Sequence, residues 1–255
     1  MLKLIANEHM KIARKRSSQV LVITFIFIHI LLALIINSLL QSAGIAENVV
    51  GYLSFSSGFL IMIQFFSAIF AGSIVAKEFD WGTVKLLLIR PHTRYKLLLS
   101  KYITSLLIGG YFILLFFVLS FILGSILFGF QGLGQSSPYI NSVLSSYGVV
   151  MIEVIMITTF AFALSTIFRN STLATAASIF IILTGKTVVE LLAHYDIKWG
   201  MFLLFANTDL GQYFDGKRPL YEEMTLPFSI IVIVVHLLIF LLASFWTFSK
   251  RDVSI

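Results

Sequence analysis

The stretch YITSLLIGGYFILLFFVLSFILGSILF, Tyr102–Phe128, decides the class of this fold, because it contains no charged side chain. A helix of about 20 mostly apolar residues crosses the roughly 30 Å hydrocarbon layer of a bilayer. The rest of the chain has the same character: 58% of its 255 residues are hydrophobic, 12% are charged, and the mean hydropathy is +0.98. Soluble domains carry about 25% charged residues. The sequence therefore predicts an all-α membrane protein.

Six stretches of the chain are apolar over a length that spans a bilayer. They cover approximately residues 20–40, 56–76, 102–128, 144–168, 172–192 and 226–248. The alternation of apolar and polar residues with period two, which a membrane β-barrel needs, is absent from the sequence. We therefore predict one transmembrane domain over residues 1–255, built from six transmembrane helices.

The distribution of lysine and arginine predicts the orientation of these helices, because the cytoplasmic loops of membrane proteins are enriched in both. Fourteen of the 18 lie in the two terminal tails, in residues 77–101 or directly after the fourth span. Only Lys198, Lys217 and Arg218 lie in residues 193–225, the segment before the last span. We therefore expect both termini in the cytoplasm of a bacterial cell, with residues 193–225 as an extracellular loop at its plasma membrane. The same asymmetry explains the net charge of +6 without a nucleic-acid partner.

Residues 1–18 precede the first span and have a helical period. Ile5 and Ile12 share an apolar face, whereas Lys3 and Lys11 lie on the opposite face. A helix of this kind lies in the headgroup layer, with its cations near anionic lipid. The alternative is a frayed basic tail that only sets the topology. We favour the interfacial amphipathic helix, with membrane lipid as its partner.

The main predicted cytoplasmic loop, KEFDWGTVKLLLIRPHTRYKLLLSK, occupies residues 77–101. Gly82 and Pro91 bracket a short helix with an apolar face, and Thr93 is placed to cap a second helix that continues into the third span. A cytoplasmic segment with so many apolar residues is typical of a docking surface. Leu87 and its neighbours would fill a groove on a partner protein. From the physics alone, a positive-inside anchor whose leucines lie on lipid is an equal alternative.

The order KE-F-D-W-GT-x-K-x-LL-x-RP-x-x-R-x-x-x-LL-x-K in this loop resembles the permease subunits of ABC transporters of the ABC-2 type. Six spans, cytoplasmic termini, an amphipathic N-terminal helix and a large outer loop before the last span fit that family over nearly the whole chain. The resemblance implies a coupling helix near Thr83–Ile89 that sits in a groove of a separate ATP-binding subunit. The expected coupling residues, with Leu87 added from the apolar face, are Glu78, Gly82, Thr83, Leu87, Arg90, Pro91, Arg94 and Lys101.

The resemblance also implies the fold of an ABC-2 type exporter transmembrane domain and a set of partners. Two permease subunits, identical or homologous, would face each other and bind two copies of an ATPase subunit. ATP and magnesium would be bound in that partner, and this chain would bind no cofactor. A small chain without a large extra domain favours export of an amphipathic compound such as a drug or an antimicrobial peptide, with an ion as the alternative substrate.

The chain is not expected to be an enzyme. Its LTGKT, residues 183–187, does not complete a phosphate-binding loop, because that motif needs a glycine where Phe180 stands and a strand before it. The five histidines have no metal-ligand spacing, so no metal site is expected. The absence of cysteine excludes disulfides and thiolate sites.

Three charged residues, Glu153, Lys186 and Glu190, fall inside predicted spans. An ionised side chain at mid-bilayer costs at least about 2.5–3.5 kcal/mol to insert, so each should face protein or water. Lys186 can pair with Glu190 one helical turn away, or with Glu153 at a similar depth on the neighbouring span. The three form either a polar patch on a transport pathway or an ion pair that locks two helices.

Two other functions follow from these features. Used as a relay, Glu153, Lys186 and Glu190 would make the chain an ion-coupled secondary carrier or channel. This alternative is weakened because no internal repeat is visible in the sequence, whereas many carriers contain one. A membrane sensor or scaffold, whose basic loop recruits a partner without transport, is the third hypothesis.

Overall fold

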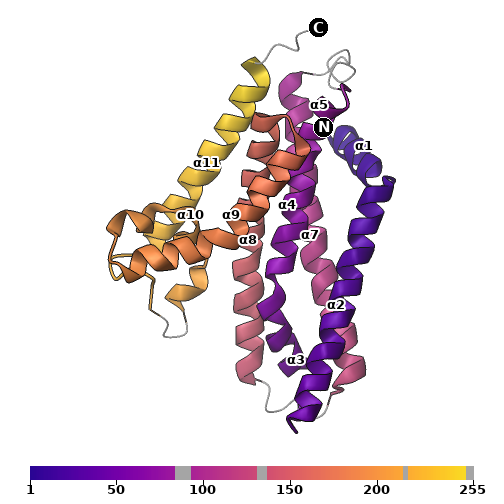
Figure 1. The fold of residues 1–255 in the computed structure, drawn as a ribbon, viewed down its shortest axis with the longest axis vertical. Coiled ribbons are helices and arrows are strands. Elements are labelled where there is room, and N and C mark those ends of the chain that lie inside the picture. The colour runs from indigo at the N-terminus through magenta and orange to yellow at the C-terminus, as the bar shows by residue number, and fades with distance from the viewer. Residues whose placement is uncertain (84–92, 131–136, 215–217, 251–255) are drawn as a thin grey trace.

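The computed structural model describes residues 1–83, 93–130, 137–214 and 218–250, and within these ranges every regular element is a helix. Figure 1 shows their arrangement as a bundle of long helices. In chain order they are α1 (Leu2–Ala13), α2 (Arg16–Ser42), α3 (Val49–Ser56), η1 (Ser57–Phe59), α4 (Ile61–Ile74), α5 (Ala76–Asp80), α7 (Arg94–Leu127), α8 (Ser137–Phe168), α9 (Ser171–His194), η3 (Lys198–Phe202), α10 (Leu204–Asn207), η4 (Leu210–Tyr213) and α11 (Leu226–Lys250).

Five of the helices, α2, α7, α8, α9 and α11, are each long and apolar enough to cross a membrane. A sixth candidate span is the pair formed by α3–η1 and α4, which is bent by 47° at its junction. The prediction of an all-α protein with several membrane spans is therefore confirmed, at five to six candidate spanning helices.

The second span differs from the continuous stretch predicted at residues 56–76. It begins earlier, at α3, where the side chain of Asn48 accepts hydrogen bonds from the first amides of the helix. The hydroxyls of Ser56 and Ser57 then donate to backbone carbonyls three residues back, at 3.0 and 2.6 Å. Side-chain bonds of this kind compete with the regular ladder, and Gly/Ser pairs are common sites of helix kinks. Gly58 follows within η1, so the span bends here.

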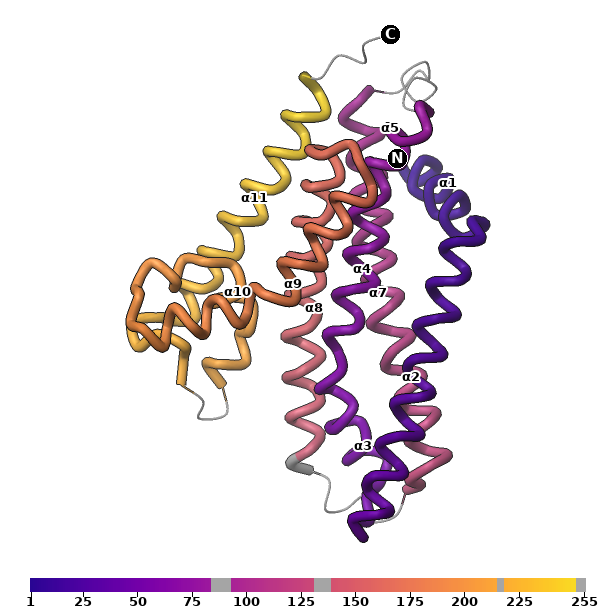
Figure 2. Tube along the Cα trace, viewed as in Figure 1, coloured from indigo at the N-terminus to yellow at the C-terminus, as the bar shows by residue number. Residues whose placement is uncertain are grey.

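Helix α4 is the centre of the bundle and contacts α7, α8 and α9 (Figure 2). Small residues on it, including Ala68, Ala71 and Gly72, are fully or almost fully buried. A Cβ at Gly72 would lie only 3.2 Å from the backbone of Thr175 on α9. Small residues let helix backbones approach closely in a bilayer, where apolar side chains gain nothing by leaving lipid.

Helix α1, α5 and the C-terminal end of α11 lie at one end of the bundle, whereas α3 lies toward the other (Figure 1). The short helices η3, α10 and η4 lie beside the bundle, near the start of α11. They form a small apolar cluster around Tyr221 and Met224.

Candidate functional site

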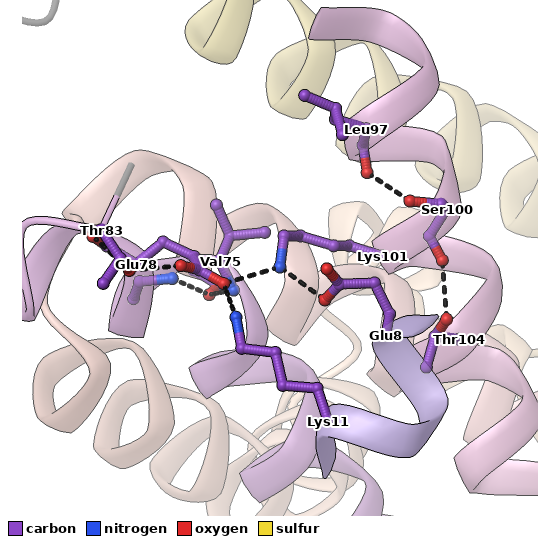
Figure 3. Close-up of polar contacts among 11 residues, drawn as sticks. Glu8, Lys11, Val75, Glu78, Thr83, Leu97, Ser100, Lys101 and Thr104 are labelled. Carbon is purple, nitrogen blue, oxygen red and sulfur yellow. Dashed lines mark hydrogen bonds and ion pairs between the residues drawn. The ribbon is translucent and has the colours of Figure 1, made fainter. Parts of the chain in front are cut away.

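The carboxylate of Glu78 is the centre of a buried polar cluster at the end of the bundle that holds α1 and α5 (Figure 3). Glu78 lies on α5, directly after the second span. Its Oε1 accepts a hydrogen bond from the Lys101 ammonium at 3.0 Å and a second from Lys11, and its Oε2 accepts one from the Thr83 hydroxyl. A carboxylate with several charged and polar donors is strongly held in place.

Lys101 links this carboxylate to the N-terminal helix. It lies on α7, and its ammonium donates to Glu8 of α1 at 2.7 Å as well as to Glu78. Its side chain is only 3% exposed, so both ion pairs are shielded from water. The Glu78 cluster, meaning Glu8, Lys11, Glu78, Thr83 and Lys101, therefore joins three helices that are distant in sequence.

The charges of the cluster lower the pKa of the Glu78 carboxyl. Burial alone would raise the pKa of this carboxyl, but the charge of Lys101 and the hydrogen bonds from Lys11, Thr83 and Lys101 outweigh it and bring the pKa down to about 2. Glu78 is consequently charged at neutral pH, as its ion pairs with Lys11 and Lys101 require.

Two further predicted coupling residues lie at the ends of the loop. Gly82 follows α5 with φ of +67°, a left-handed conformation that glycine adopts without a Cβ penalty. Arg94 begins α7 and donates to the backbone carbonyl of Ser249 at 3.3 Å, away from the Glu78 cluster. Thr93 caps α7 through the amide of Lys96, as predicted. Because α7 runs unbroken to Leu127, the end of the loop and the third span are one helix.

The remaining three predicted coupling residues, Leu87, Arg90 and Pro91, lie outside the described residues. Most of the coupling helix expected near Thr83–Ile89 lies outside them too.

The charges inside the spans form a second polar site. The ammonium of Lys186 on α9 lies 2.6 Å from Glu153 of α8, and Gln64 of α4 donates to the same carboxylate at 2.5 Å. Lys186 was expected to pair with either Glu153 or Glu190, and in the structure it pairs with Glu153. Glu190 lies one turn further along α9.

Two neighbouring cavities open around this ion pair. One, of about 350 Å³, is lined by Gln64, Glu153, Lys186 and Asp209 among others. The second, also about 350 Å³, shares Lys186 and Asp209 with the first and adds Glu190. The ion pair thus locks α8 to α9 and at the same time faces polar space, so the two interpretations of these charges are compatible.

Sequence reasoning missed Glu8, Lys11 and Asp209 as site residues. Lys11 was assigned to the lipid headgroups, but the structure pairs it with Glu78, because α1 packs against α7 and turns this face toward the bundle. A signal for Glu8 was present, since it is the single acidic residue before Glu47 in a basic segment. Nothing in the local pattern marks Asp209, which lines the same two cavities as Lys186.

Comparison with known proteins identifies relatives over almost the whole chain. A family model described as a protein of unknown function (DUF2705) matches residues 40–254. The uncharacterized membrane protein YdbK of Bacillus subtilis is 36% identical over 96% of this chain and 100% of its own length. The uncharacterized protein YhcI of the same organism is 39% identical over 80% of this chain and 68% of its own length.

Proposed function

The chain belongs to the DUF2705 family, and from this premise of a multi-pass membrane protein with bacterial relatives we propose that it is the membrane-spanning permease subunit of an ABC transporter. Its cargo is an amphipathic compound such as a drug or an antimicrobial peptide, moved outward. ATP is hydrolysed in a separate subunit, of which two copies bind the predicted cytoplasmic end of two paired permeases.

The observation that carries this proposal is the buried ion pair between Glu78 and Lys101. The two residues flank the loop whose sequence resembles the ABC-2 coupling loop, and their charged groups lie 3.0 Å apart. Removing one partner of a buried ion pair costs about 3–5 kcal/mol, so the two ends of the loop stay together when force is applied between them. A loop fastened at its base transmits the movement of a bound partner instead of absorbing it.

The continuity of α7 supports the transmission of a loop movement into the membrane-spanning part of the chain. A displacement of the loop acts on Arg94 at the start of α7, and the same helix reaches Leu127 at the opposite end of the bundle. ATP-driven closure of the partner subunits would then bias two conformations of the permease pair, as a ligand biases any two-state equilibrium. Helix α1, through Glu8 and Lys11, moves with the base of the loop.

A pull-down with an ATPase assay tests the proposal. The tagged chain is extracted from its native membrane in mild detergent, and co-purified proteins are identified by mass spectrometry. We expect an ATPase subunit with the wild type, its loss with Leu87→Asp and Arg94→Glu, and its retention with Lys3→Glu, a charge reversal at an exposed position of α1. Because Arg94 also contacts α11, Leu87→Asp carries the greater weight. Absence of any ATPase, with no effect of either variant, would contradict the proposal.

An ion-coupled carrier is the second candidate, favoured by the cavities that open at Glu153 and Lys186. It predicts transport in proteoliposomes that follows a proton or sodium gradient without ATP and is lost with Glu153→Gln. The permease proposal predicts that no such gradient drives transport when the ATPase subunit is absent.

A further inference from the structure

A basic cavity of about 250 Å³ lies beside the Glu78 cluster, between α1, the start of α2, the end of α4, α5 and α7. Its charged lining consists of four lysines and two glutamates: Lys11, Lys15, Lys77, Lys101, Glu8 and Glu78. Both glutamates already pair with Lys11 or Lys101. The positive charge of the other two lysines is therefore in excess within the cavity.

Lys15 and Lys77 meet in this cavity. Both side chains line it and lie close enough for the charge of Lys77 to act on Lys15, and the Lys15 ammonium is 3.9 Å from the centre of the Trp81 ring. Burial and the neighbouring charge of Lys77 lower the pKa of Lys15, and burial lowers the pKa of Lys77 despite the charge of Asp80 nearby. Two adjacent ammonium groups repel each other, and an anion bound by both offsets this repulsion.

The start of α2 adds to the attraction for an anion. Helix α2 begins at Arg16 without a side-chain cap, and Ser17 and Ser18 of its first turn line the basic cavity. The first amides of a helix and its dipole favour negative charge, and the two hydroxyls are additional donors.

An apolar groove of about 780 Å³ continues from the basic cavity along α2 and α7. The two spaces share Ile12, Ser18 and Phe70, and the groove then follows Val22 and Val118 toward the middle of the bundle. A free phosphate would fill only the basic cavity. A molecule with an anionic head and a hydrocarbon chain fills both.

We propose that the basic cavity and the apolar groove together bind one anionic phospholipid of the adjacent leaflet. Its phosphate accepts hydrogen bonds from Lys15 and Lys77, and one acyl chain lies in the groove between α2 and α7. This site depends on the chain being a membrane protein and is independent of the ABC assignment. The bound lipid fastens α1 and the base of the loop to the membrane surface.

Lipid binding by the full-length chain in detergent tests this proposal, with native mass spectrometry as the readout and phosphatidylglycerol as the probe. We expect phosphatidylglycerol to remain bound more tightly than phosphatidylcholine. The double variant Lys15→Gln/Lys77→Gln should weaken binding about thirtyfold, which corresponds to about 1 kcal/mol for each lysine near a lipid phosphate. Lys3→Gln/Lys198→Gln, which removes two exposed lysines, should leave it unchanged.

A variant that fills the apolar groove distinguishes binding of a lipid from binding of a free anion. Val118→Trp places a large ring in the apolar groove and should displace phosphatidylglycerol, whereas Leu183→Trp, at an exposed position of α9, should not. The variant Lys15→Gln/Lys77→Gln removes a repulsion between two lysines. Its melting temperature without lipid should therefore equal or exceed that of the wild type, and this result would show that weaker lipid binding is not caused by misfolding. Equal retention of the two lipids, or competition by inorganic phosphate combined with no effect of Val118→Trp, would overturn the proposal.

Discussion

The buried pair of Glu78 and Lys101 should contribute measurable coupling energy to the stability of the protein. The pKa of Glu78 falls from 4.5 to about 2 in the folded state. Since one pKa unit corresponds to about 1.4 kcal/mol, the cluster favours the charged carboxylate by about 3 kcal/mol. We therefore expect Glu78→Gln to cost about 2–3 kcal/mol, because Lys101 remains buried with Glu8 as its other partner.

A double-mutant cycle isolates the pair from its surroundings. Glu78→Gln, Lys101→Met and the double variant are unfolded in detergent by titration with a denaturing surfactant, with tryptophan fluorescence as the signal. The double variant should be more stable than the sum of the single effects predicts, by about 1–3 kcal/mol, as is usual for groups in one network.

The pair formed by Lys198 and Glu223 is the matched control. Its charged groups lie 2.5 Å apart, but both side chains are more than half exposed. Exposed ion pairs contribute about 0.2–1 kcal/mol, so the cycle of Lys198→Met and Glu223→Gln should give a coupling energy in that range. Equal coupling energies for the two pairs would refute the reasoning, because burial would then have no effect.

Three further predictions concern pH, backbone strain and the intramembrane charges. The low pKa of Glu78 stabilises the fold above about pH 4.5, and this contribution is lost as the pH falls toward 2, so melting curves of the wild type should shift downward in that window more than those of Glu78→Gln. Gly82→Ala should cost about 1 kcal/mol, because φ of +67° is strained for alanine, and Gly82→Asn should cost less; equal melting temperatures for the three proteins would contradict this. Lys186→Met should destabilise the protein more than Glu153→Gln does, because the first leaves a charge on a carboxylate that is 7% exposed, whereas the second leaves a lysine that is 45% exposed. The reverse order in a thermal-unfolding assay would show that Glu153 does not depend on this ion pair.

Several features of this protein are determined by sequence alone. The apolar stretches predict the spanning helices, and the Thr93 cap predicts where α7 begins. Both follow from interactions between residues at most a few positions apart, which a local pattern records. The predicted importance of Glu78 and Lys101 came from a resemblance in the loop, and the structure brings the two side chains together.

Other features were decided only by tertiary structure. Lys101 pairs with Glu8 across 93 residues of sequence, and Lys11 pairs with Glu78 across 67. The choice of Glu153 over Glu190 by Lys186 depends on how α8 packs against α9. In a bilayer a charged side chain must find a partner or water wherever helix packing provides one. Hydropathy decides which segments enter the membrane, whereas the positions of neighbouring helices decide which charges meet.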